Sequence, residues 1–447
     1  PKNLIMHLLH KSFNVKGNIN PKVSADQKKI SNKLFKKIYS KIKKKEDILK
    51  IKILNIHIGD LIYDEYLRYY KEPTINFKNK KFQTHLNNMI NLFIFWFDFL
   101  KKNNVKSIVI SHSVYAIAII SRIAIYKNIR VFNIGLSYAY SLNKKNKLRL
   151  SGFDRYKEDF KLISKLLNKN LRNYAKKELY NKLHGKKVQS FSINNNANYS
   201  SFKKIKIKKN KKLKEKILVA SHCLTDAVHA YGSYQFPDFY SWLEYLGNLS
   251  KKLDYEWLLK VHPNQYDLNL KEMKKFVKKF PKFKLLDKKI SHNEILNSYK
   301  ILSVLTVYGS VGHEYPLFGV PVINSSTNNP HAKYNFNINV RSKKELKKLI
   351  TNIKNIKKPN KIALKNEVFE FYYMRYLSEY YCINNLVSII NKLGSDYNSP
   401  LLYKWWIKNF DINHHNKITK DYKNFIESGR FRMQADNTGN SSIYLEI

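Results

Sequence analysis

Short apolar segments of strand length recur along this chain, and segments of helix length separate them. In the first half, strands are expected at Ile51–Ile56, Val105–Ser111 and Arg130–Ile134. The second half follows the same rhythm, with expected strands at Ile217–Ala220, Trp257–Val261, Phe283–Leu286, Ile301–Thr306 and Pro321–Asn324. Strands that alternate with helices favour a parallel sheet covered by helices. The sequence therefore predicts an α/β protein.

The alternation is interrupted once, at 186–216, where Asn, Ser and Lys dominate. A chain of 447 residues also exceeds one usual hydrophobic core. We therefore expect two Rossmann-like domains facing across a cleft, at 1–185 and 217–395, joined by a basic linker. A basic, aromatic and helical tail is expected at 396–447.

The formal net charge is +50, from 83 Lys and Arg against 33 Asp and Glu. Lys, Asn, Ile, Tyr and Phe are all abundant, which is typical of an AT-rich genome, so a solvated-surface bias explains much of the charge. An anionic membrane surface or anionic substrate is the alternative partner, and nucleic acid is not expected because no recognition module is present. No run of apolar residues reaches the length of a membrane span.

Two cysteines, Cys223 and Cys382, form no disulfide framework, which fits a reducing cytoplasm. No signal-peptide pattern opens the sequence, and Pro1 in place of Met indicates a fragment or a trimmed chain. We expect a cytoplasmic protein that can associate with the inner face of the plasma membrane.

The segment Thr306–Asn324 (TVYGSVGHEYPLFGVPVIN) predicts a strand, a Gly-Ser turn and a helix that ends at Gly319. Free backbone amides at such a helix start favour phosphate, and glycine lets the backbone approach a ligand. A carboxylate one turn into the helix can bind sugar or ribose hydroxyls. These arguments predict donor-binding residues at Gly309, Ser310, Gly312 and Glu314. An ordinary strand–turn–helix is the alternative.

A second element, KVHPN, follows the expected strand Trp257–Val261. Pro263 stiffens the loop and disfavours helix at His262. Lys260 and His262 could then stabilise the charge that develops on a phosphate leaving group.

The third element is Ala220–Tyr231 (ASHCLTDAVHAY), which leaves the first strand of the second half. Transfer to a hydroxyl needs a base, and we assign that role to Asp226, with His222 and His229 either orienting it or serving in its place. The spacing of these residues also permits a metal site, but no fourth ligand is evident, and we expect neither a metal nor another cofactor.

Polar residues of the first half also fall where expected strands end. Loops at the carboxyl ends of parallel strands form the ligand crevice of such sheets. These residues, predicted to line the acceptor side, are His57, Gly59, Asp60, His112 and Tyr115.

Lys260–Asn264 followed by Gly309–Pro321 resembles the donor half of GT-B glycosyltransferases that make capsule and other surface polysaccharides. IGDLIYDEYLR, ISHSVYA, SHCLTDAVHAY and KVHPN together resemble uncharacterised surface-carbohydrate biosynthesis proteins. The resemblance covers about 51–330. It implies a CMP-, UDP- or GDP-linked sugar donor bound mainly by the second domain, a glycan or lipid-linked glycan acceptor at the first, and no metal.

Three other functions remain open. UDP-sugar 2-epimerases share this fold and a similar glycine turn, and CDP-polyol phosphotransferases also use a His-Pro and a later serine turn. A non-catalytic basic protein that binds membrane or nucleic acid is the third.

Overall fold

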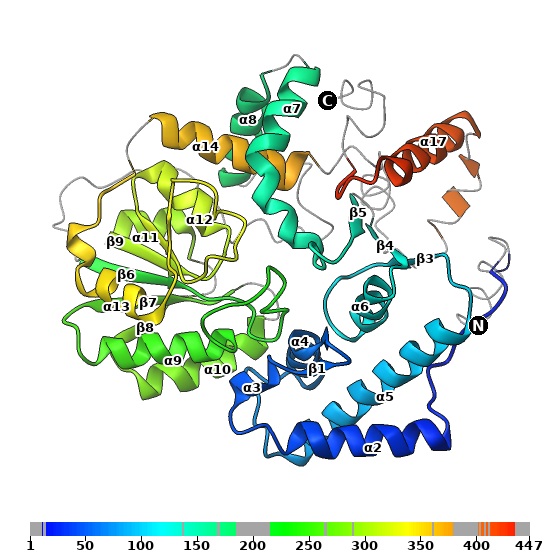
Figure 1. Cartoon of the computed structure of the whole chain (residues 1–447). Helices are drawn as coiled ribbons and strands as arrows, with labels where there is room; N and C mark the ends of the chain where they lie inside the picture. Colours follow the sequence, from blue (N-terminus) through cyan, green and yellow to red (C-terminus); the bar gives the residue numbers. More distant parts are fainter. Residues whose placement is uncertain are drawn as a thin grey trace.

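The computed structural model describes residues 11, 15–135, 138–167, 170–184, 215–262, 266–287, 290–359, 362–378, 401, 404–405, 408–409 and 412–433. Its strands form a three-stranded sheet in the first half, a six-stranded sheet in the second half and a two-stranded hairpin. The expected α/β class is confirmed, and Figure 1 shows the two halves lying beside each other.

The second half is built on a six-stranded sheet in which every neighbouring pair is parallel. Its spatial order is β8-β7-β6-β9-β10-β11, with the first strand in the chain at the centre. This is the 3-2-1-4-5-6 order of a doubly wound, dinucleotide-binding type of sheet. Its strands are β6 (Glu215–Ala220), β7 (Glu256–Lys260), β8 (Phe283–Leu285), β9 (Lys300–Thr306), β10 (Val322–Asn324) and β11 (Ile338–Asn339). The strands expected from the sequence in this half are confirmed, and β11 is an addition.

Helices cover both faces of this sheet (Figure 1). Alternate residues of β6 point to opposite faces, so Ile217 and Val219 join one core while Leu218 and Ala220 join the other. The first face packs against α9 (Phe239–Ser250), α10 (Tyr266–Lys279) and α13 (Lys343–Thr351). The second packs against α11 (His292–Ser298), α12 (Val311–Glu314) and α14 (Ile362–Tyr372). A capping box formed by Ser291 and Glu294 begins α11.

The first half is smaller than the expected full Rossmann-like domain. Strand β3 (Ser107–Ile110) pairs in parallel with β4 (Arg130–Gly135), which pairs in antiparallel fashion with β5 (Tyr138–Leu142). The single buried strand predicted at Ile51–Ile56 is wrong. That segment is a tight antiparallel hairpin of β1 (Lys52–Ile53) and β2 (Ile56–His57), because Leu54 and Asn55 both adopt positive φ.

Helices of the first half surround these strands. They are α2 (Ala25–Tyr39), α3 (Lys45–Ile48), α4 (Gly59–Tyr70), α5 (Lys80–Lys102) and α6 (Ile119–Tyr126), with a short 3₁₀ turn η1 (Ala116–Ala118) before α6. We call residues 15–142 the N-terminal unit and the six-stranded sheet with its helices the C-terminal unit.

Two segments cross between the expected domains. After the 3₁₀ turn η2 (Arg149–Arg155), the helices α7 (Tyr156–Leu167) and α8 (Leu171–Leu183) lie before the predicted linker but pack with α14 in the C-terminal unit. Near the end of the chain, α17 (Ile412–Ser428) packs back on the N-terminal unit, where Phe425 contacts Phe132. The predicted linker mostly lies outside the described residues, and its last two positions already belong to β6. The remaining elements are the 3₁₀ turns η4 (Tyr315–Phe318) and η5 (Ile353–Asn355) and the π-helical turn η6 (Tyr373–Leu377).

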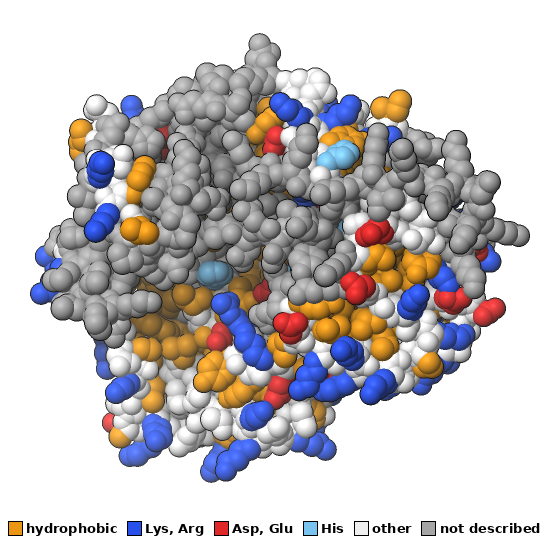
Figure 2. Space-filling model, turned by 180° about the vertical axis from the view of Figure 1, so that it is seen from behind, with side chains coloured by type: hydrophobic (Ala, Val, Ile, Leu, Met, Phe, Trp, Pro, Cys, Tyr) orange, Lys and Arg blue, Asp and Glu red, His pale blue; other side chains and the backbone are white. Residues whose placement is uncertain are grey.

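Positive side chains are spread over the face of the molecule that Figure 2 shows. Figure 2 shows Lys and Arg side chains scattered across the visible face among apolar ones, with no single basic patch. In the described part of the chain, no helix is both long and apolar enough to cross a membrane.

Candidate functional site

The candidate site lies where the carboxyl ends of β6 and β9 meet. From these neighbouring strands the chain leaves for helices on opposite faces of the sheet, which is the switch point where doubly wound sheets bind ligands. The loop after β6 carries His222, Asp226 and His229, and the loop after β9 carries Gly309 and Ser310. Two separate sequence motifs are thus brought together.

His222 ties these two loops to each other. Its Nε2 lies 3.1 Å from the Thr306 hydroxyl and accepts from the backbone N–H groups of Val307 and Tyr308, at 3.2 and 3.4 Å. The ring stacks on Phe239 with centroids 4.5 Å apart. Burial lowers the pKa of His222 to about 3. Because its acceptor nitrogen is already engaged, the imidazole is suited to positioning the loops rather than to taking a proton.

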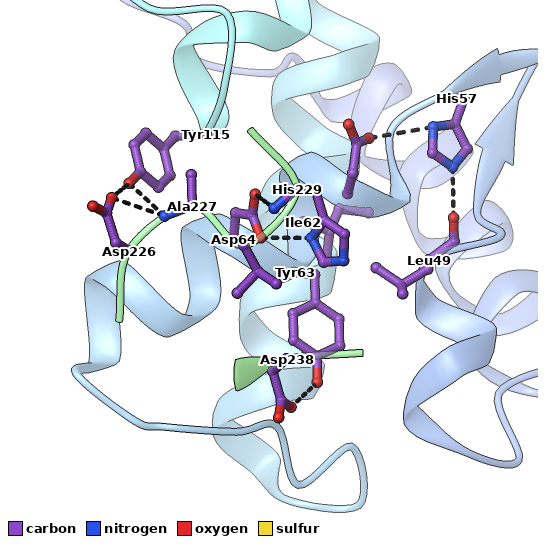
Figure 3. Close-up of polar contacts among 12 residues, drawn as sticks. Leu49, His57, Ile62, Tyr63, Asp64, Tyr115, Asp226, Ala227, His229 and Asp238 are labelled. Atoms are coloured by element: carbon purple, nitrogen blue, oxygen red, sulfur yellow. Dashed lines mark hydrogen bonds and ion pairs between the residues drawn. The ribbon is translucent and has the colours of Figure 1, made fainter. Parts of the chain in front are cut away.

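Asp226 is exposed and faces the N-terminal unit. Its Oδ1 accepts from the Tyr115 hydroxyl at 2.5 Å and from the backbone N–H of Ala227 at 2.8 Å (Figure 3). Tyr115 is held with φ of +65°, a strained value for a residue with a side chain, and the Arg68 guanidinium lies 4.3 Å from its ring centroid. Burial and the Asp226 charge raise the pKa of Tyr115, so the phenol stays a donor. The carboxylate is therefore oriented and still reachable by a ligand.

His229 is buried in an ion pair with a residue that sequence reasoning missed. Its Nδ1 lies 2.7 Å from Oδ1 of Asp64, and its backbone N–H donates to Oδ2 of the same carboxylate at 3.1 Å (Figure 3). Burial opposes a charged imidazole, but the Asp64 carboxylate outweighs it and raises the pKa of His229. Burial in turn raises the pKa of Asp64. The Nε2 of His229 is buried with no hydrogen-bond partner among the described residues.

A second carboxylate of the C-terminal unit also binds the N-terminal unit. Asp238, the N-cap of α9, accepts from the Tyr63 hydroxyl at 2.5 Å (Figure 3). It also accepts from the Thr74 hydroxyl at 2.6 Å. The Lys45 ammonium lies 3.5 Å away. Tyr63 and Asp64 are adjacent on α4, so this helix donates to Asp238 of the C-terminal unit through Tyr63 and accepts from His229 through Asp64. The adjacent Tyr63 and Asp64 in the string IGDLIYDEYLR were the available sequence signal.

The predicted phosphate cradle is only partly open. The N–H of Gly309 donates to the Thr306 hydroxyl at 3.2 Å, and the N–H of Gly312 donates to the Gly309 carbonyl at 2.9 Å. The helix expected from Ser310 to Gly319 is one α turn, α12, followed by the 3₁₀ turn η4. Ser310 precedes α12, and its side chain makes no capping bond.

Gly312 and Glu314 face the protein interior rather than the cleft. A Cβ at position 312 would lie 2.5 Å from the ring of His331, so glycine is needed there for packing. Glu314 is fully buried, and its Oε1 accepts from the Lys182 ammonium of α8 at 2.9 Å. This buried ion pair, and not a sugar hydroxyl, is the partner that the structure gives to Glu314.

Lys260 and His262 lie at the end of β7. The Lys260 ammonium donates to the Ile290 carbonyl at 2.7 Å, and burial lowers its pKa to about 8. His262 is half-buried, and its backbone N–H donates to the Ser221 hydroxyl at 3.2 Å. Burial lowers the pKa of His262 to about 4, an effect that the Asp226 charge partly opposes. Pro263 and Asn264 lie outside the described residues.

The residues predicted on the acceptor side are dispersed. Tyr115 alone reaches the loop after β6, whereas His112 is exposed beside Ser111 at the end of β3. Asp60 is buried against the Arg122 guanidinium at 2.6 Å, and its other oxygen lies 3.3 Å from His57. A Cβ at Gly59 would lie 2.2 Å from the Ile48 carbonyl oxygen, so this glycine serves the packing of α3 against α4.

In the described part of the chain, no group of three or more His, Cys, Asp or Glu side chains is arranged to hold a metal ion. The carboxylates of Asp226, Asp238 and Asp64 accept hydrogen bonds from tyrosine hydroxyls, from backbone N–H groups and from the His229 ring.

The sheet order and the loops at its switch point define an α/β protein of the doubly wound, Rossmann type. No family model and no curated protein matches the chain. Two similar solved structures are of the UDP-GlcNAc 2-epimerase of Methanocaldococcus jannaschii, one of them in complex with UDP-GlcNAc and UDP. They are 17% and 16% identical to this chain, cover 63% of it and 79% and 80% of their own length, and have TM-scores of 0.26 and 0.25. A likeness of this size carries no inference about function.

Proposed function

We propose that this protein is a GT-B glycosyltransferase that moves a sugar from a nucleotide-sugar to a growing surface glycan such as a capsule, O-antigen or lipopolysaccharide. The observation that carries the proposal is the meeting of Asp226 with Tyr115. Asp226 lies in the loop at the switch point of the doubly wound sheet, its carboxylate is exposed, and it contacts Tyr115 of the N-terminal unit. A donor at the switch point and an acceptor on the N-terminal unit would meet at this carboxylate.

Each site residue then has a role. The nucleotide would lie at the ends of β6, β7 and β9, near Ser310, Lys260 and His262. As the bond to the sugar breaks, charge grows on the leaving phosphate, and a cationic Lys260 or a His262 that becomes protonated would stabilise it. Asp226 would remove the proton of the attacking hydroxyl.

Of the three candidate bases, the geometry supports Asp226. The acceptor nitrogen of His222 is engaged by backbone N–H groups, and His229 is buried in its pair with Asp64. Asp226 is exposed, and its Oδ2 is not used by the two hydrogen bonds that orient Oδ1. His229 would serve to hold the loop after β6 against α4.

The proposal includes a cytoplasmic place of action at an anionic membrane surface, where lipid-linked glycan acceptors would be met. The large lysine excess supports this part.

The test is a thermal-shift screen of the full chain against CMP, UDP, GDP and CDP, followed by incubation with the matching nucleotide-sugar. Stabilisation by one nucleotide and transfer of its sugar to a glycan acceptor are expected. Epimerisation of the donor sugar, transfer of a polyol phosphate from a CDP-linked donor, or no response to any nucleotide would each replace the proposal with one of the alternatives.

A further inference from the structure

A groove with an apolar floor and a lysine rim lies on the N-terminal unit, between α2, α5 and the β1–β2 hairpin. Its volume is about 960 Å³, and it shares no lining residue with the candidate site. The floor is formed by aliphatic and aromatic side chains, among them Leu34, Ile53, Phe93 and Phe97. It therefore offers an apolar surface apart from the candidate site.

Two large apolar side chains at this groove are exposed to solvent. Ile30 on α2 is 54% exposed, and Leu54 at the tip of the β1–β2 hairpin is 57% exposed. They come from separate elements and line one groove, so this is more than a single stray apolar residue on the surface.

The rim is strongly cationic. Lys33, Lys37, Lys41 and Lys52 are exposed, and no carboxylate of the described residues pairs with their ammonium groups.

Two carboxylates also line the groove, but both are already engaged. Asp47 pairs with Lys50 at 3.1 Å, and Asp98 accepts from Gln27 at 2.8 Å. The five lysines that line the groove outnumber these two carboxylates, so the net charge around its apolar floor is positive.

We propose that this groove binds an anionic membrane lipid, with an acyl chain along the apolar floor and the phosphate at the lysine rim. Lysines with long apolar stems are suited to such a boundary, because the stem covers apolar surface while the ammonium reaches the phosphate. The inference locates the membrane contact of the proposed function but depends on neither the nucleotide nor the transfer reaction.

The experiment is co-sedimentation of the full chain with vesicles of phosphatidylcholine alone and of phosphatidylcholine mixed with phosphatidylglycerol. Binding should need the anionic lipid and weaken as salt rises. Lys33→Glu combined with Lys37→Glu and Lys41→Glu should lower the partition coefficient at least ~10-fold. Ile30→Ser combined with Leu54→Ser should lower it ~5-fold or more without changing the charge.

The matched control is Lys344→Glu with Lys347→Glu and Lys348→Glu, which reverses three exposed charges on α13 in the other unit. This control should stay within ~2-fold of the unchanged protein, since lipid contact is local. An equal loss of vesicle binding in the control would show that binding depends on total charge, and it would contradict the proposed lipid site in the groove. Equal binding to both vesicle types would do the same.

Two further measurements distinguish other occupants. A long-chain alkyl phosphate should compete with the vesicles, and inorganic phosphate should not. Competition by inorganic phosphate alone would show that the groove binds phosphate and not a lipid. A dimer seen by light scattering, and lost on Ile30→Ser with Leu54→Ser, would make a second copy of the chain the occupant. Nucleotide binding should be unchanged in all three variants, so loss of lipid binding cannot be confused with failure of the proposed transferase.

Discussion

The carboxylate of Asp64 on α4 and the imidazole of His229 in the loop after β6 lie 2.7 Å apart, and both are buried. They are 165 residues apart in the sequence and belong to different units. This pair joins α4 of the N-terminal unit to the loop that carries the proposed base.

Replacing Asp64 with Asn should destabilise the protein by about 3–5 kcal/mol, because it leaves His229 with a buried imidazole and no counter-charge. Urea unfolding measures this free energy. Asp26→Asn is the matched control, since Asp26 forms only an exposed contact with Lys29 and its removal should be nearly neutral. Similar small losses in both variants would contradict a stabilising role for the pair.

Glu314 and Lys182 form another buried ion pair, which connects α12 with α8. Glu314→Gln should lower the free energy of unfolding by about 3–5 kcal/mol, because the Lys182 ammonium is left buried. Combining it with Lys182→Met should recover much of the loss. If the double variant is as unstable as the sum of both single ones, the two residues are not coupled. A loss of nucleotide affinity without loss of stability would instead favour the donor contact predicted from the sequence.

The proposed base is tested by Asp226→Asn, which keeps the shape of the side chain and removes its basicity. Turnover should fall ~100-fold or more, with nucleotide affinity almost unchanged. Tyr115→Phe removes only the hydrogen bond that orients the carboxylate, so a smaller fall of about 10-fold is expected. A near-normal turnover of Asp226→Asn beside an inactive His229→Ala variant would transfer the role of base to the histidine.

His262→Ala should weaken nucleotide binding by about 1–3 kcal/mol if the ring donates to a phosphate oxygen. Isothermal titration of the folded variant gives the affinity. Ser310→Ala reports on the neighbouring loop and should have a smaller effect, as a neutral hydroxyl makes weaker bonds to phosphate. Wild-type affinity in the His262 variant would remove this residue from the donor site.

Stability should fall as the pH drops from 6.5 toward 4. Burial lowers the pKa of His222 and His331 to about 3 and of His85 to about 4, all below their ordinary value of 6.5. In this window the unfolded chain binds protons that the folded chain does not, so each such histidine lowers the free energy of unfolding by up to about 1.4 kcal/mol per pH unit. Asp64, whose pKa is raised, opposes the trend, but it is outnumbered.

Urea midpoints between pH 7.5 and 4.5 measure this dependence. His85→Gln keeps a donor for the Ile62 carbonyl but cannot be protonated, so its stability should depend less steeply on pH. A flat profile for the unchanged protein across this range would show that the histidines are not buried in their neutral form.

The class of fold and most strands of the six-stranded sheet could be predicted from the sequence alone, because apolar runs of strand length are local signals. The sequence also predicts that the loops after β6, β7 and β9 lie at one edge of the sheet, because the carboxyl ends of parallel strands lie at the same edge. It did not reveal the hairpin at Leu54 and Asn55, where the positive φ of two residues decides against a continuous strand.

The packing of distant segments sets which polar side chains are paired inside the protein and which stay exposed at the candidate site. The sequence predicts Glu314, Gly312 and Asp60 as site residues. In the structure, Lys182 pairs with Glu314, His331 packs against Gly312 and Arg122 pairs with Asp60. Asp64 and Asp238 look like ordinary helix carboxylates and yet join the two units. The physical reason is that a buried charge needs a partner. The packing of helices and sheet sets which residue becomes that partner, and a local sequence pattern does not contain this information.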